Sequence, residues 1–285
     1  MQNIVTEIKK SLYLPFFILS CFGVVLVCLL SEGYTSLGGK SYTIMELLLF
    51  LSKDTMLTDV SLNRYEIWMK GIGTWTQLLL PFLLSIGYLY DISNEKLTGM
   101  HRLILVRENN LGYCISKTIS AMLSGGIIMF VGYAIFGAII FIKFPSIQEY
   151  PVDYLNMYME SFYGFQEFFG GLKRCIGIFL YGMCINIFAY FVSIIFVDKY
   201  ILLCLPIMMK YIWGQTILKI EMNAINTGQD ALLNLCSGLR IENILSMNQS
   251  VFWWMTLLLV FVIYMGGFCL NLYLLKKKGS EVGFE

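Results

Sequence analysis

The chain has 285 residues, of which 58% are hydrophobic and only 14% are charged, and its formal net charge is +1. Its mean hydropathy of +0.70 is far above that of soluble domains and indicates a membrane protein. Such a small net charge provides no basic field for phosphates, which excludes nucleic acid as a partner. Eight cysteines without a Cys-x-x-Cys spacing, and a single histidine, give no pattern for a zinc or other metal centre.

The first segment of the chain predicts a helix on the membrane surface followed by a membrane span. Residues 1–11 place Ile4 and Ile8 four residues apart with charged residues between them, a pattern typical of an amphipathic interfacial helix. Residues 12–30 are almost continuously apolar, and about 20 such residues cross a hydrocarbon core roughly 30 Å thick. The stretch that follows has no P-loop, because that motif requires a glycine where this chain has Tyr34.

Five further apolar stretches predict the remaining spans. Between them lie polar or aromatic segments whose apolar islands are too short to cross a bilayer. We therefore expect an all-α integral membrane protein with six transmembrane helices in a single domain. The expected spans are 12–30, 75–90, 118–142, 175–197, 200–218 and 251–275, and the expected outer segments are 31–74, 143–174 and 219–250.

The distribution of lysine and arginine predicts the orientation. Residues 1–11, 91–117, 198–199 and 276–285 hold half of the 20 cations in roughly 50 residues, whereas the other half is spread over about twice that length. The positive-inside rule therefore places both termini and the 91–117 segment in the cytoplasm. An even number of spans agrees with two cytoplasmic ends.

The 91–117 segment is the longest cation-rich interruption between apolar runs. Its pattern predicts a membrane helix that extends into the cytoplasm, a turn at Gly99, a short amphipathic helix and re-entry at Lys117. An ordinary connecting loop is the alternative interpretation. The apolar stripe consists of four residues at helical spacing, namely Leu97, Met100, Leu103 and Ile104. Four polar residues fall largely on the other side of the helix, namely Glu95, Thr98, His101 and Arg102.

This segment resembles the first cytoplasmic loop of type-2 ABC exporter permeases. The matching residues are Glu95, Gly99, Leu103, Leu105, Arg107, Gly112 and Lys117, and the chain departs from the family pattern at Glu108-Asn109, where many members have a proline and small polar residues. In that family the loop contains the coupling helix, which docks on a separate ATPase subunit.

The resemblance implies a permease subunit in a bacterial cytoplasmic membrane, paired with a second permease copy or a homologous permease and with two ABC ATPase subunits. ATP and Mg would bind the partner ATPase, so this chain would hold no cofactor or metal and would not itself be an enzyme. The residues that it implies for ATPase coupling are Glu95, Gly99, Arg102, Leu103, Ile104 and Arg107.

Polar and small residues within the expected spans are the other candidates for function. Asn186, Lys210 and Asn271 are candidates for a translocation path, because polar groups at membrane depth usually face a bundle interior or cavity. In the alternative interpretation the two asparagines are interhelical hydrogen-bond partners, and Lys210, a few residues from the end of a short span, snorkels to the outer interface. Small residues in the third span predict close helix packing at Ala121, Gly125 and Gly126.

Three classes of function remain open on the sequence. An integral membrane enzyme needs titratable groups at membrane depth, and a stand-alone secondary transporter or channel usually shows internal repeats. Neither feature is found in this sequence. A permease subunit explains why a cytoplasmic amphipathic helix occurs without any nucleotide motif. We therefore expect the chain to export an amphipathic or hydrophobic substrate, such as an antimicrobial peptide or drug, with energy from a separate ATPase subunit.

Overall fold

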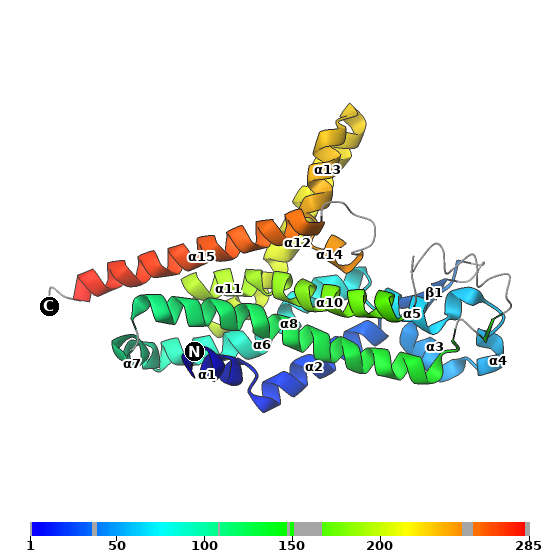
Figure 1. Cartoon of the computed structure of the whole chain (residues 1–285), viewed down its shortest axis with the longest axis horizontal. Helices are drawn as coiled ribbons and strands as arrows, with labels where there is room; N and C mark the ends of the chain where they lie inside the picture. The colour runs from blue at the N-terminus through cyan, green and yellow to red at the C-terminus, as the bar shows by residue number, and fades with distance from the viewer. Residues whose placement is uncertain are drawn as a thin grey trace.

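The computed structural model describes residues 2–35, 39–107, 109–146, 149–150, 167–246 and 253–282. This part of the chain forms an elongated bundle of helices (Figure 1). The helices are α1 (Gln2–Ser11), α2 (Leu14–Leu29), α3 (Ile44–Phe50), α4 (Lys53–Met56), α5 (Arg64–Lys70), α6 (Thr74–Leu97), α7 (Met100–Arg107), α8 (Asn110–Lys143), α10 (Glu167–Ile185), α11 (Ile187–Ile195), α12 (Lys199–Thr227), α13 (Asp230–Leu239), α14 (Asn243–Ser246) and α15 (Trp253–Val282), with a 3-10 turn at Val60–Leu62.

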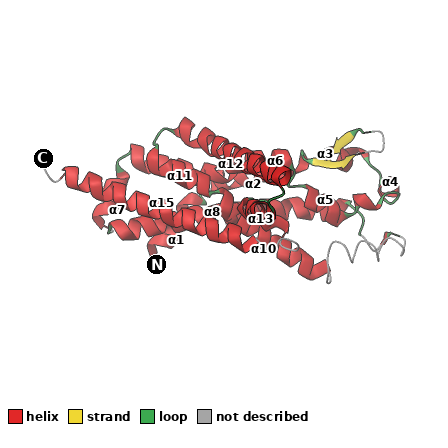
Figure 2. Cartoon of the chain, turned by 90° about the horizontal axis from the view of Figure 1, so that it is seen from above, coloured by secondary structure: helices red, strands yellow, loops and turns green. Residues whose placement is uncertain are grey.

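The expectation of a wholly α-helical chain is wrong in one place. Strand β1 (Glu32–Thr35) pairs antiparallel with β2 (Ser41–Thr43), and Figure 2 shows this hairpin beside α3. Thr43 ends the hairpin and caps α3, since its side chain accepts a hydrogen bond from the Glu46 backbone while the Glu46 carboxylate accepts one from the Thr43 backbone. The protein is therefore mostly helical.

Four stretches of the described chain are long and apolar enough to cross a membrane, namely Asn110–Lys143, Arg174–Ile195, Tyr200–Thr227 and Trp254–Lys277. Two further candidate spans are present if each of two bent helix pairs is counted as one span. The pairs are α1 with α2, bent by 60°, and α5 with α6, bent by 68°. Helix α2 alone has 16 residues, which at about 1.5 Å per residue falls short of a hydrocarbon core of roughly 30 Å. The chain thus has four to six candidate spans.

Two of the expected spans have different boundaries in the structure. The helix expected at 175–197 is interrupted at Asn186, which separates α10 from α11. The helix expected to end at residue 218 continues as α12 to Thr227, where Gly228 ends it with a positive φ of 65°. Helix α13 then turns back along α12, and the two form a hairpin that projects from the side of the bundle (Figure 1).

Helix α8 runs through the centre of the bundle and packs against α10, α2, α1 and α15. The small residues of α8 lie where it meets α10. Ala121 is fully buried, and a Cβ atom added at Gly125 would lie 2.7 Å from the backbone oxygen of Gly182 on α10. A Cβ at Gly126 would lie 2.8 Å from the Phe179 ring. The two helices therefore approach each other closely at these positions.

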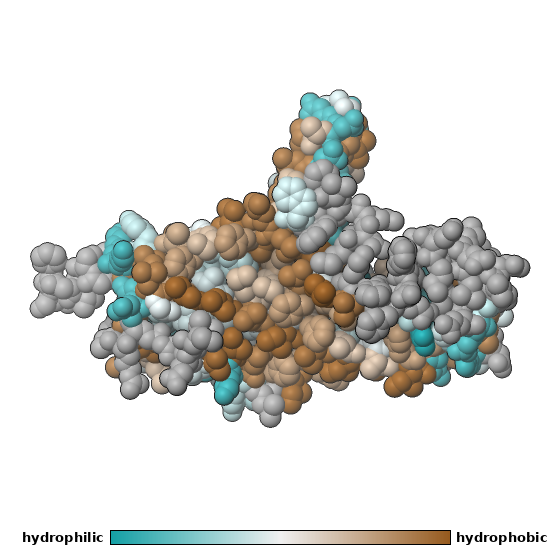
Figure 3. All heavy atoms as spheres, in the orientation of Figure 1, coloured by the Kyte–Doolittle hydropathy of each residue, from teal (hydrophilic) through white to brown (hydrophobic). Residues whose placement is uncertain are grey.

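On the face that Figure 3 shows, hydrophobic residues cover most of the middle of the molecule, whereas hydrophilic ones lie toward its two ends and at the tip of the projecting hairpin. The end that carries α1 and α7 also receives the last turns of α15 (Figure 1). An apolar belt between polar ends is the arrangement expected of a bundle embedded in a bilayer.

We expect cysteine labelling to distinguish the two ends of the bundle. In a background without the native cysteines, Lys53→Cys on α4 should react with a membrane-impermeant maleimide added to intact cells. Asn110→Cys at the start of α8 should not react, because cation density places that end in the cytoplasm. As a control, Asn110→Cys should become reactive once the cells are permeabilised. Its reaction in intact cells would contradict the predicted orientation.

Candidate functional site

The chain reverses direction between α6 and α8 through a short helix. Helix α6 runs beyond the expected end of its span to Leu97, and Gly99 then turns the backbone with a φ of 71°, a conformation that other residues rarely adopt. Helix α7 follows at once, and α8 begins at Asn110. The structure therefore contains the predicted succession of an extended helix, a turn, a short helix and a returning helix.

The turn between α6 and α8 presents apolar side chains to its surroundings. Leu103 on α7 is 67% exposed, and its neighbour Ile104 is half-buried. The side chains of Arg102 and Arg107 lie outside the described part of the structure. We name as the α7 surface the exposed apolar residues of this turn, which are Leu97, Met100, Leu103 and Leu111.

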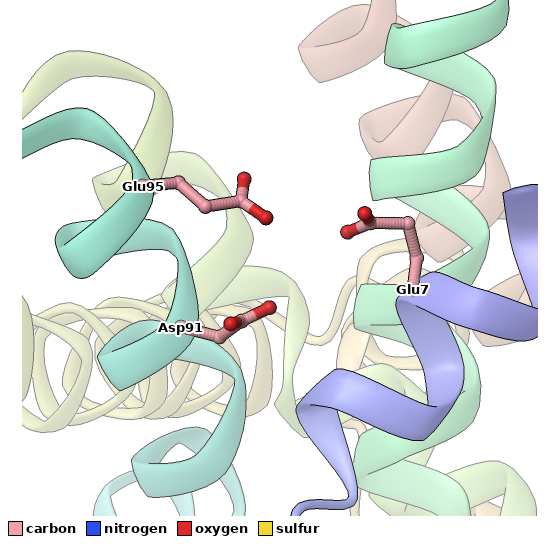
Figure 4. A group of neighbouring side chains, drawn as sticks. All are labelled: Glu7, Asp91 and Glu95. Carbon is pink, nitrogen blue, oxygen red and sulfur yellow. The ribbon is translucent and has the colours of Figure 1, made fainter. Parts of the chain in front are cut away.

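Directly behind this turn lies a cluster of charged side chains from three helices, which we call the charge cluster. Helix α1 contributes Glu7 and Lys10, α6 contributes Asp91 and Glu95, and α8 contributes Lys117. The Lys117 ammonium pairs with Glu7 and lies 2.7 Å from the Glu95 carboxylate. Lys10 bridges the same two carboxylates at 3.0 Å and 3.2 Å. Figure 4 shows the three acidic side chains converging from the two sides of this cluster.

The centre of the charge cluster is removed from solvent, because Lys117 is 3% exposed and Glu95 is 4% exposed. Buried charges of this kind destabilise the folded protein unless they are paired, because each of them has lost its hydration. Neighbouring contacts fix the same junction, including a 2.8 Å hydrogen bond between the hydroxyls of Ser11 and Ser120. The cluster therefore specifies how α1, α6 and α8 are placed relative to one another.

The three carboxylates have the geometry of an oxygen-rich cation site. One oxygen each from Glu7, Asp91 and Glu95 lie within 4.8 Å of one another. The ammonium group of Lys117 already bridges two of these carboxylates, however, so a side chain of the protein supplies the cation that they require. With all five groups ionised, two ammonium groups face three carboxylates. We interpret the cluster as a structural junction.

A second junction ties the end of α6 to the end of α11. The Lys96 ammonium donates to the backbone oxygen of Ser193 and, at 3.4 Å, to that of Ile194, in the last turn of α11. The Ser93 hydroxyl donates to the Val197 backbone oxygen at 3.1 Å. A cation at the C-terminus of a helix binds carbonyl groups that have no partner within the helix. Helix α6 is thus anchored on two sides immediately before the turn into α7.

The polar residues expected within the spans take different positions. Asn186 is completely buried, and its amide donates to the Ala121 backbone oxygen at 2.6 Å, so the structure places it as an interhelical partner. Asn271 is half-buried and interacts with the Tyr190 hydroxyl. Both positions agree with the alternative that interprets these asparagines as packing residues.

Lys210 lies in the middle of α12 rather than near the end of a short helix, because α12 continues to Thr227. It is 6% exposed, and its ammonium pairs with Glu242 on the segment between α13 and α14. Lys210 instead forms part of the wall of a pocket, which is described below.

Sequence reasoning missed the charge cluster. It interpreted residues 1–11 as a helix lying in the membrane interface and did not predict that Glu7 and Ser11 of α1 are buried where α1 meets α6 and α8. Lys117 was noted as the point of re-entry into the membrane but not as a buried ion-pair partner. The signal that was available is the presence of acidic and basic residues next to the predicted inner ends of three spans.

Comparisons of the chain with protein-family models, with curated proteins and with solved structures found no match. The features that bear on function are the α7 surface, the two junctions behind it and the sequence pattern of residues 95–117. These features concern one end of the bundle, where α6 turns into α8.

Proposed function

We propose that this chain is the membrane-spanning subunit of an ATP-driven exporter and that the α7 surface binds a separate ATPase subunit. The observation that supports this proposal is the exposure of Leu97, Met100 and Leu103 at a polar end of the bundle. Exposed apolar side chains that gather in one place are typical of interaction surfaces. Cation density places this end in the cytoplasm, where an ATPase would have access to ATP.

The two junctions behind α7 connect it to other helices through which a movement of α7 would be transmitted. Glu95 is tied to α1 and α8 by the charge cluster, and Lys96 is tied to the end of α11. A displacement of α7 is therefore passed to several helices rather than absorbed by a loose loop. An ATPase that contacts α7 differently in its nucleotide-bound and nucleotide-free states shifts the bundle between two arrangements, and only such differential contact can transmit work.

We assign ATP hydrolysis to a partner subunit because the sequence contains no nucleotide-binding motif in any of its 285 residues. ATP and Mg are accordingly assigned to two partner ATPase subunits, and a second copy of this permease, or a homologous permease, completes the transporter in a bacterial cytoplasmic membrane. The cargo that we propose is amphipathic or hydrophobic, such as an antimicrobial peptide or drug. The aromatic residues of the predicted outer segments support that class of cargo.

A substitution on α7 tests the proposal directly. Leu103→Asp is expected to abolish retention of the ATPase when the permease is purified from its native membrane with a mild detergent. Burial of a leucine side chain contributes about 1.5–3 kcal/mol, and an aspartate at the same position would place a charge in an apolar groove. The measurement is the amount of ATP-hydrolysing protein that is recovered with the permease.

The matched control is Leu49→Asp on α3, at the opposite end of the bundle (Figure 1). Leu49 is 66% exposed, so the substitution and the exposure match those of Leu103. It should leave ATPase retention unchanged. If the unsubstituted permease retains no ATPase and still moves substrate alone, the chain is a stand-alone secondary transporter or channel.

A further inference from the structure

A pocket of about 430 Å³ lies between α6, α12 and the segment that joins α13 to α14. This volume falls in the range of small-molecule sites. The pocket is far from α7, because Gln77 and Leu78 of its wall belong to the first turns of α6, at the other end of that helix. Helix α12 forms much of the remaining wall with residues 210–218.

The polar side of the pocket is formed by two cations that each pair with one carboxylate. Among the described residues of its wall, Lys210 and Arg240 are the cations, and Glu242, which pairs with Lys210, is the acidic residue. Glu221 pairs with Arg240 but does not belong to the wall. The ion pair with Glu221 uses one terminal nitrogen of a guanidinium that has five N–H donors, so Arg240 has the capacity to bind a second acceptor. Arginine is well suited to phosphate because two of its donors bind two oxygens at once.

The other side of the pocket is apolar and adjoins exposed apolar side chains. Leu78, Ile217 and Leu218 line it. Of the lining residues, Tyr211 and Leu218 on α12 are exposed, and so is the neighbouring Leu79 on α6. Trp213 fixes the nearby backbone, since its indole nitrogen donates to the Leu239 backbone oxygen at 3.3 Å. A ligand that fits such a pocket has a charged head and an apolar chain.

We propose that this pocket binds an anionic amphiphile of the phospholipid class, with the phosphate at Arg240 and Lys210 and the acyl chain along α6 and α12. The N–H donors of Arg240 and Lys210 that their carboxylate partners leave unused bind the phosphate oxygens, and the exposed apolar wall accommodates the chain. This site does not depend on the proposed ATPase, so its test and the test of α7 succeed or fail separately.

Gly214 offers a variant that fills the pocket without disturbing the fold. It lines the pocket, and a Cβ atom added there meets no atom within 4 Å. Gly214→Leu therefore places a side chain in open space, and replacing a helical glycine also favours the helix by up to about 1 kcal/mol. The matched control is Gly266→Leu on α15, where an added Cβ likewise meets nothing within 4 Å.

The experiment measures binding of phosphatidylglycerol to the purified protein in detergent by native mass spectrometry, with phosphatidylcholine and glycerol phosphate as comparison ligands. We expect phosphatidylglycerol to bind at least tenfold more tightly than phosphatidylcholine, and glycerol phosphate to show no binding at the same concentration. Gly214→Leu should reduce phosphatidylglycerol binding at least tenfold, whereas Gly266→Leu should leave it unchanged.

Charge variants test the head-binding part of the proposal. Arg240→Gln should remove the preference for the anionic lipid, and Arg240→Lys should restore part of it. Lys219→Gln, which removes an exposed cation of α12 outside the pocket, should have no effect. Equal binding of both lipids, tight binding of glycerol phosphate alone, or full phosphatidylglycerol binding by Gly214→Leu would each overturn the proposal.

Discussion

Replacing Lys117 with methionine is expected to lower the free energy of unfolding by about 3–5 kcal/mol, the cost of leaving buried charges without their partner. Methionine keeps the length of the side chain and removes its charge, so the packing of α8 changes little. The carboxylates of Glu7 and Glu95 then face each other with only Lys10 between them. The measurement is chemical unfolding in mixed micelles, followed by circular dichroism.

The control for Lys117→Met is Lys9→Met, which removes an exposed lysine from α1 and should change the unfolding free energy by less than about 0.5 kcal/mol. A triple variant that adds Glu7→Gln and Glu95→Gln should recover part of the loss, because it removes the unpaired charges as well. If Lys117→Met is as mild as Lys9→Met, the charge cluster does not stabilise the bundle.

Gly125→Leu is expected to cost about 3 kcal/mol or more, at the upper end of the usual range for overpacking. Its Cβ would lie 2.6 Å from the Asn186 Cβ and 2.7 Å from the Gly182 backbone oxygen. A backbone oxygen has no alternative rotamer, so α10 as a whole has to move away from α8. We expect a lower midpoint of thermal unfolding and a lower yield of folded protein in detergent.

Gly112→Leu is the control for Gly125→Leu. Gly112 lies on the same helix, α8, but a Cβ added there meets nothing within 4 Å. Leucine at this position should be neutral or slightly stabilising, since glycine in a helix costs about 1 kcal/mol relative to alanine. Equal effects of the two substitutions would show that loss of glycine, rather than contact between α8 and α10, causes the change.

Much of the helical layout was predictable, because the thickness of a bilayer sets the length of an apolar run. The turn at Gly99 was equally accessible, since a glycine between a helical stripe and a following helix indicates a change of direction. The short helix after Gly99 was likewise predictable, and the structure contains it as α7. In each case the information is local in the sequence.

The remaining features depend on contacts between distant residues. Periodicity shows which residues of α1 share a face, but not that the face with Glu7 turns inward to meet Lys117. Asn186 lies within an apolar run, and nothing in that run indicates that its amide contacts the Ala121 backbone of another helix. The pocket likewise joins Gln77 to residues more than a hundred positions later in the chain. A single sequence carries no record of such pairings.

The separation of Glu7 from Lys117 has a consequence for biosynthesis. The two residues are 110 positions apart, which at synthesis rates of about 5–20 residues per second corresponds to a delay of roughly 5–20 s. During that delay the Glu7 carboxylate has no ammonium partner on α8 and cannot leave water without a large penalty. The polar contacts of Glu7 with α8 therefore form only after the chain from α2 to α7 has been made. Helix α1 is thus synthesised before α8 but reaches its final place only after the ribosome has delivered Lys117.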